Sequence, residues 1–343
     1  MADGFLRVLG RNKVKTTIDR ATFNTIAVLG FVTVIISVPW EEIFRAVNGY
    51  GFVDKGVYSE YFLYKTSVLD YKEFSGILSY ISNEFLWHYA IGWLVNNTGI
   101  LIDHVFLAIS FITLLIFGLL LAKWQGIYAL PLLVNPLVID FAFSQYRLAL
   151  AISILGAAYL LHGRYRAISF ALVLTSLLIH SGTTLFILIY AAVWLAQWLS
   201  IRFRIGCSTV FAILFAVGAF ISLLIGPLRE ALLSAIGDRR AEYHDMSSSL
   251  LYSLFWIALL IPFYLGRRYL VTLDYARYAL VIVSIVFVNV FHGGYSTRFL
   301  AAAFPGLVSA VLSLHGVIKI MILVLFIVYA VFQWLYWLRL LSG

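Results

Sequence analysis

The stretch Phe143–Ile154, FSQYRLALAISI, places a polar group directly before an apolar run that is expected to cross a membrane. Arg147 follows Ser144, Gln145 and Tyr146 and opens this run. A charge buried unpaired in lipid is costly, so this arginine needs a partner or a function. We expect it at the N-terminal end of its helix, where arginine and free backbone N–H groups together can bind an anion. The simpler interpretation is an interfacial arginine whose charge reaches lipid headgroups.

The composition is that of a membrane protein. The chain of 343 residues is 63% hydrophobic and 12% charged, whereas soluble domains carry about 25% charged residues. Apolar runs recur along most of its length, and they are continuous rather than alternating, which excludes a β-barrel. We therefore predict an all-α polytopic integral membrane protein, a single membrane domain over residues 1–343 with about 10–12 transmembrane helices, some kinked or re-entrant.

The distribution of charge predicts the orientation. Five basic residues within segment 1–21 indicate a cytoplasmic N-terminus under the positive-inside rule. No small-residue cleavage site follows the first apolar run, which we interpret as a retained helix. The net charge of +8 then reflects topology rather than nucleic-acid binding. The long acidic segment 41–84 and a second segment, 226–249, are expected on the periplasmic face. The second contains PLREALLSAIG, which predicts a short amphipathic helix on the membrane surface.

In this topology the unusual polar residues fall on the outer face. His180 and His292 end rising helices, and Arg298, like Arg147, begins a descending one. A single histidine at a helix end is more often a hydrogen-bonded interfacial residue than a catalyst. Several arginines and histidines on one face, in a chain with few charges, nevertheless favour a shared site.

The second outer segment adds the sequence GDRRAEYHD. Arg239 and Tyr243 are four residues apart and would share one side of a helix, next to Arg240. The bland interpretation is that the two arginines bind lipid headgroups, and that the tyrosine is one of many at membrane interfaces.

Several chemistries have no motif in the chain. There is no HExxH, no paired CxxC, no phosphate-binding GxxxxGK[ST] and no GxSxG, and Cys207 is the only cysteine. The outer acids are scattered, so we expect no metal site and no cofactor. Scarce charge in the middle of the spans also argues against an ion-driven pump.

Short motifs along the chain resemble a known family. They are RLALA at 147–151, IHSG at 179–182, R-x-x-x-Y at 239–243, the arginine in YSTRFL, and VYSEYF followed by EFLWHYAIGWL in the first outer segment. Together they resemble the EpsG-like family of bacterial polysaccharide polymerases, related to the Wzy repeat-unit polymerases of O-antigen, capsule or exopolysaccharide. The chain departs from the family pattern in its first outer segment, where Asp70-Tyr71 comes late.

The resemblance implies a multi-pass enzyme of the bacterial inner membrane with its active site on the periplasmic side. It would be a metal-independent glycosyltransferase. It would move the growing glycan from undecaprenyl diphosphate to the non-reducing end of an incoming undecaprenyl-diphosphate-linked oligosaccharide. Membrane lipid, a chain-length regulator and a flippase are the other implied partners.

The residue chemistry suits this reaction. Guanidinium groups can stabilise the negative charge that develops on a departing diphosphate. A histidine can accept the proton of the attacking hydroxyl, and His180 is the first choice for this base. The expected catalytic residues are His180, Arg147 and His292, and the expected diphosphate ligands are Arg147, Arg239, Arg240, Tyr243 and Arg298.

Other functions stay open at this point. An O-antigen ligase would use the same donor and the same outer residues but a different acceptor. A metal-dependent glycosyltransferase using a polyprenyl monophosphate sugar would depend on Glu41 or Glu42. A lipid-linked oligosaccharide flippase should line an interior cavity with charge, and a membrane scaffold would need no site at all.

Overall fold

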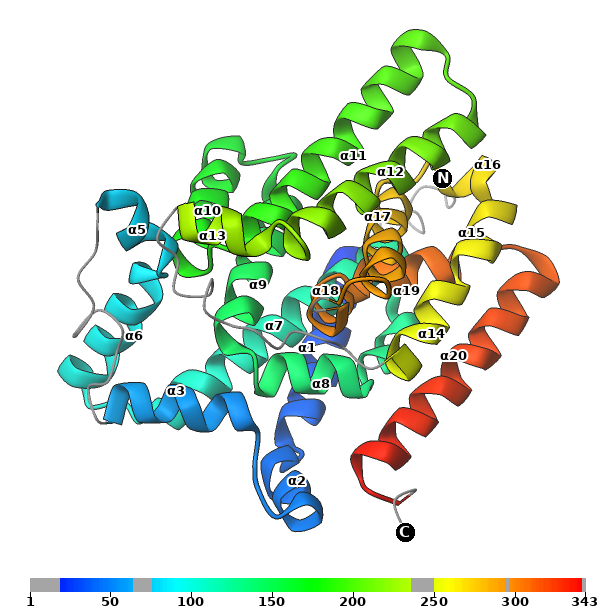
Figure 1. The fold of residues 1–343 in the computed structure, drawn as a ribbon. Helices are drawn as coiled ribbons and strands as arrows, with labels where there is room; N and C mark the ends of the chain where they lie inside the picture. The colour runs from blue at the N-terminus through cyan, green and yellow to red at the C-terminus, as the bar shows by residue number, and fades with distance from the viewer. Residues whose placement is uncertain (1–18, 64–75, 236–249, 294–295, 341–343) are drawn as a thin grey trace, which may run out of the picture.

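The computed structural model describes residues 19–63, 76–235, 250–293 and 296–340, and these ranges contain helices and connections but no strand (Figure 1). The first helices are α1 (Arg20–Ser37), α2 (Trp40–Asn48), α3 (Val53–Leu63), α5 (Ile77–Ser82), α6 (Phe85–Thr98), α7 (Ile102–Trp124), the 3-10 helix η1 (Ile127–Leu133), α8 (Pro136–Phe143), α9 (Tyr146–Leu161) and α10 (Arg166–Ile179). They are followed by α11 (Thr183–Phe203), α12 (Cys207–Ile225), α13 (Arg229–Ala235), α14 (Leu250–Ala258), α15 (Leu260–Leu265), α16 (Arg267–Leu270), α17 (Asp274–Asn289), α18 (Ser296–Ala302), α19 (Phe304–Leu312) and α20 (Gly316–Trp337).

Five of the described helical segments are long and apolar enough to cross a membrane, and a sixth is added if the bent pair α8 and α9 counts as one span. They are 21–48, α7, α11, α12 and α20. The prediction of an all-helical chain with several potential membrane spans is therefore confirmed for the described residues. The expected 10–12 transmembrane helices and the cytoplasmic N-terminus stay predictions, and residues 1–18 lie outside the described ranges.

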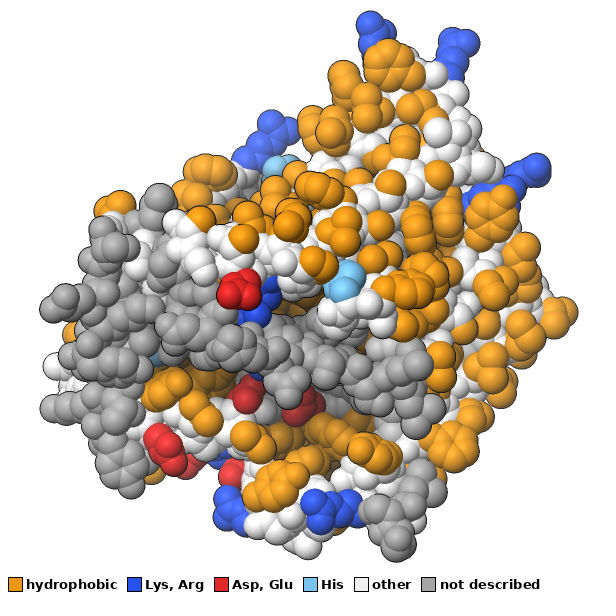
Figure 2. Space-filling view, viewed as in Figure 1, with side chains coloured by type: hydrophobic (Ala, Val, Ile, Leu, Met, Phe, Trp, Pro, Cys, Tyr) orange, Lys and Arg blue, Asp and Glu red, His pale blue; other side chains and the backbone are white. Residues whose placement is uncertain are grey.

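Hydrophobic side chains cover much of the face shown in Figure 2, chiefly over α11, α12, α14 and α20, whereas basic side chains stand at the turn between α11 and α12. The apolar side chains include Trp194 on α11, Phe220 on α12 and Phe332 on α20, each at least 55% exposed. Exposed apolar surface of this extent is what lipid-facing helices require.

Helix α17 forms the centre of the larger core, with most of its side chains buried. Gly218 of α12 allows a close approach to it, because a Cβ atom at Gly218 would lie 2.5 Å from Cβ of Ser284 and 2.7 Å from the carbonyl oxygen of Val281. In lipid no hydrophobic effect drives helices together, so their association depends on close packing, which small residues such as glycine permit.

We predict that Gly218→Val lowers the free energy of unfolding in detergent micelles by about 1–3 kcal/mol, because the added methyl groups overpack the α12–α17 contact. Gly30→Val is the matched control, since nothing lies within 4 Å of the Cβ position in α1. Equal stability of the two variants would contradict the close contact.

Segment 41–84, expected as an outer loop, holds three helices in its described parts: α2, α3 and α5. Helix α3 packs through aromatic side chains on α6, α7 and α9. Tyr58 lies edge-on to Trp87 and Tyr146, with ring centroids 5.8 and 6.3 Å apart, and Tyr146 stacks on Phe106 at 4.2 Å. These rings form a second core, separate from the one around α17.

The chain breaks twice between α7 and α9. The Asn135 side chain caps α8 by accepting a hydrogen bond from the Leu137 N–H at 3.0 Å, and Pro136 occupies the first turn, where it costs no helical hydrogen bond. Helix α8 then meets α9 at an angle of 103° (Figure 1). The Ser110 hydroxyl donates to the Ala142 carbonyl at 2.7 Å and satisfies one acceptor at the end of α8. This bend places Arg147 in the first turn of α9.

An aromatic cluster joins α2 to the end of α20. Trp40 stacks on Trp334 with centroids 5.4 Å apart, and Phe44 lies edge-on to Trp337 at 4.6 Å. The cluster also reaches the last residue of α8, since the ring of Trp40 lies 6.5 Å from that of Phe143. It therefore fixes the end of α20 next to the α8–α9 break.

Candidate functional site

Arg147 is bound to a carboxylate that stands far away in the sequence. Its Nη1 donates to Oε2 of Glu84, 63 residues earlier, and the two side chains are only 16% and 3% exposed. Glu84 precedes α6 and has a φ of +67°, a left-handed conformation that is unfavourable for a side chain of this kind. The anion at the N-terminal turn of α9 is thus supplied by the protein itself.

The pairing leaves part of the guanidinium unsatisfied. Nε of Arg147 is buried and has no hydrogen-bond acceptor within the described ranges. The ring of Tyr58 covers the guanidinium, whose central carbon lies 4.9 Å from the ring centroid. A cation over an aromatic face is further stabilised by the ring quadrupole. Burial raises the pKa of the Tyr58 hydroxyl above its ordinary value, so this side chain stays neutral next to the arginine.

His180 meets the same carboxylate from a third segment, the turn between α10 and α11. Its Nδ1 lies 3.5 Å from Oε1 of Glu84 and accepts a hydrogen bond from the Gly182 N–H at 2.9 Å. Since Nδ1 acts as the acceptor in the shorter contact, the proton of the neutral ring belongs on Nε2. In this tautomer Nε2 is a proton donor, and it becomes an acceptor when the ring proton moves to Nδ1, which lies next to Oε1 of Glu84.

Arg298 approaches the site through α3. Its Nη2 lies 3.6 Å from Oδ2 of Asp54, and both side chains are partly exposed. Asp54 and Tyr58 are one turn apart on α3, so this helix contacts Arg298 with one residue and Arg147 with the other. The cluster of Glu84, Arg147, His180, Tyr58 and the Asp54–Arg298 pair is hereafter called the Arg147 site.

His292 belongs to a different network, between α12 and the segment after α17. Its Nε2 lies 3.0 Å from the Ser222 hydroxyl and its Nδ1 lies 2.9 Å from the Gly293 carbonyl oxygen. Ser222 also bonds the Asn289 side chain at 2.5 Å. Both ring nitrogens are therefore engaged within the protein, and a role as base would require one of these contacts to break.

Of the expected site residues, the structure brings Arg147 and His180 together on Glu84. It places Arg298, from α18, against Asp54 of α3, the helix whose Tyr58 covers Arg147. Arg239, Arg240 and Tyr243 lie outside the described residues. The sequence alone does not distinguish Glu84 from the other acidic residues of segment 41–84. An acidic residue directly before the apolar helix α6 was the available signal, although nothing local indicates its partner.

Glu41, the alternative metal ligand, takes part in ion pairs. It accepts hydrogen bonds from Arg45 at 2.8 Å and from Lys55, which also lies 2.8 Å from Asp103. Burial alone would lower the pKa of Lys55, but hydrogen bonds to Asp103 and Glu41 outweigh it and the pKa is raised. Within the described ranges, no group of three or more His, Cys, Asp or Glu side chains is placed to hold a metal ion.

Comparisons with known proteins place no relative beside this chain: no family model, no curated protein and no solved structure matches it.

We predict that Glu84 and Arg147 are strongly coupled in stability. Glu84→Gln or Arg147→Met alone should lower the free energy of unfolding by about 3–5 kcal/mol, because each leaves a buried charge without its partner. The double variant should lose less than the sum of the two, measured as a double-mutant cycle in detergent.

The pair Glu41–Arg45 is the matched control, since the Arg45 side chain is 63% exposed. Its double-mutant cycle should give a coupling of no more than about 1 kcal/mol. A coupling at Glu84–Arg147 as small as that of the control would contradict a buried, desolvated pair.

Proposed function

We propose that this chain is a polymerase of lipid-linked oligosaccharide repeat units in the bacterial inner membrane. It moves the growing glycan from undecaprenyl diphosphate to the non-reducing end of an incoming undecaprenyl-diphosphate-linked unit, on the periplasmic face. The observation that carries the proposal is the Arg147 site, where a cation and a histidine from separate segments converge on one buried carboxylate.

The charges of the site suit a departing diphosphate. Glu84 takes Nη1 of Arg147 and fixes the orientation of the guanidinium, which has further N–H donors. A fixed guanidinium can stabilise charge developing on the leaving group without rearranging at the moment of reaction. Arg298 supplies a second cation near α3. The proposal also assigns Arg239, Arg240 and Tyr243 as ligands of the diphosphate.

His180 is the base in this proposal. For Nε2 to take the proton of the acceptor hydroxyl, the ring proton must lie on Nδ1 and point at Oε1 of Glu84, 3.5 Å away, in place of the hydrogen bond from the Gly182 N–H. The Glu84 carboxylate then stabilises the imidazolium that forms. The glycosyl bond to the diphosphate breaks and a bond to the acceptor oxygen forms. His292 has both ring nitrogens engaged within the protein, so a role as base would break one of its contacts to Ser222 or Gly293.

An O-antigen ligase would use the same donor and the same leaving group, so the site itself favours neither enzyme. The two differ in acceptor, and the size distribution of surface glycolipid separates them.

We predict that Arg147→Lys, expressed in a deletion strain at wild-type abundance, reduces polymer formation about 10²–10³-fold. Lysine keeps the charge opposite Glu84 but lacks the planar fork of donors. His180→Ala should have a comparable effect. The measurement is surface glycolipid resolved by size, with protein abundance determined in the same membranes.

Arg164→Ala is the matched control, because Arg164 is exposed and follows α9 at the opposite end of that helix from Arg147; it should restore the full ladder. Collapse to a single repeat unit in the deletion strain supports a polymerase, whereas full-length polymer left on its carrier lipid indicates a ligase. A normal ladder with Arg147→Lys would remove Arg147 from the reaction.

A further inference from the structure

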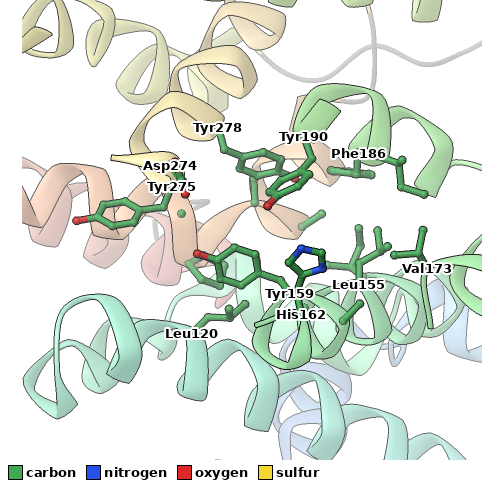
Figure 3. Close-up of a pocket in the computed structure, with 18 of the residues that line it drawn as sticks. Leu120, Leu155, Tyr159, His162, Val173, Phe186, Tyr190, Asp274, Tyr275 and Tyr278 are labelled. Atoms are coloured by element: carbon green, nitrogen blue, oxygen red, sulfur yellow. The ribbon is translucent and has the colours of Figure 1, made fainter. Parts of the chain in front are cut away.

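A cavity of about 360 Å³ lies among α7, α9, α10, α11, α17 and α19 (Figure 3). Its wall is mainly apolar, and along α9 it extends from Ile152 to His162. Ile152 is five residues beyond Arg147, about 7.5 Å along the helix axis. The cavity therefore lies beneath the Arg147 site, with α9 common to both.

The two ends of the cavity differ in exposure. Near the Arg147 site it is lined by Phe117, Ile152 and Phe186, which are 1%, 7% and 6% exposed. Toward the turn between α9 and α10 it is lined by exposed residues, including Phe170 of α10 at 66% and Tyr190 of α11 at 47%. The cavity is thus closed below the Arg147 site and opens sideways between α10 and α11.

Polar groups are present at the open end. Figure 3 shows His162, Tyr159 and Tyr190 facing the same space. The hydroxyl of Tyr190 has no hydrogen-bond partner in the described part of the chain. Arg166 and His162 are exposed at the mouth, and neither forms an ion pair with another residue that the structure describes.

The mouth carries a net positive charge. Lys123, which is not part of the wall, lies 4.8 Å from the ring centroid of Tyr159, which is part of it. The acid of the wall, Asp274, is already paired with Arg277. An apolar chamber with a cationic entrance matches an amphiphile with an anionic head.

We propose that this cavity binds an anionic phospholipid of the cytoplasmic leaflet, with one acyl chain between α10 and α11 and its phosphate at Arg166 and His162. The leaflet follows from the orientation that the charge distribution predicts, which places Lys123, Arg164 and Arg166 inside. The buried end excludes the tail of a lipid whose head lies at Arg147, because Phe117, Ile152 and Phe186 close that path. This lipid site does not depend on the proposed polymerase function.

The first test measures lipid retained by the purified full-length chain after equilibration with vesicles of equal phosphatidylglycerol and phosphatidylcholine. Native mass spectrometry should find one phosphatidylglycerol per wild-type chain. Val173→Trp fills the cavity from α10 and should abolish retention, whereas the control Leu174→Trp, on the lipid-facing side of the same helix at 45% exposure, should retain the lipid.

Ile187→Trp fills the same space from α11 and provides a second test in case Val173→Trp does not fold. Thermal unfolding shows whether each variant is folded. Equal retention by either folded cavity-filling variant and by Leu174→Trp would overturn the proposal. So would displacement of the bound lipid by added undecaprenyl phosphate but not by added phosphatidylglycerol, since the occupant would then be a polyprenyl chain.

The second test addresses the headgroup. Arg166→Gln should weaken the preference for phosphatidylglycerol over phosphatidylcholine about fivefold, whereas Arg164→Gln, two residues away and absent from the cavity wall, should leave it unchanged. Wild-type protein that retains both lipids equally would overturn the assignment of an anionic head.

Discussion

The buried pair of Arg147 and Glu84 is the constraint around which one end of this molecule is arranged. An arginine in the first turn of α9 faces an unfavourable helix dipole and little water, so a carboxylate must reach it. Glu84 does so from a left-handed backbone conformation that costs energy by itself. The turn before α6, the α8–α9 break and the turn after α10 are thereby held together at one point.

This arrangement also explains why α3 lies where it does. Its aromatic residue covers the guanidinium, and its acidic residue one turn earlier contacts Arg298. A helix in a segment rich in charge is therefore fixed by two cations and by aromatic packing on α6 and α7, the latter through the same Tyr58 ring that covers Arg147. The Glu84 carboxylate that neutralises Arg147 also lies 3.5 Å from His180, so one acidic group serves both the arginine and the histidine.

The composition was sufficient to predict a helical membrane protein. A continuous apolar run that spans a membrane can hydrogen-bond all its backbone N–H and C=O groups only by forming a helix. Arg147 and His180 could be selected because polar residues beside such runs are conspicuous. Glu84 could not be identified, since a contact across 63 residues leaves no local pattern. Likewise, nothing near His292 indicated Ser222, which comes from another helix, and the charge of segment 41–84 concealed the helices it forms.

The aromatic cluster of Trp40, Trp334 and Trp337 has a consequence for depth in the bilayer. Indole rings concentrate where hydrocarbon meets headgroups, so the cluster marks that level on the protein. The ring of Phe143 lies beside it, and Arg147, four residues later, stands in the first turn of the next helix. The lipid-linked oligosaccharide of the proposed function would reach such a level by diffusing in the plane of the membrane, with its phosphates at their usual height and its sugars in water. The helices therefore need no polar path across the bilayer, in keeping with the scarcity of charge along them.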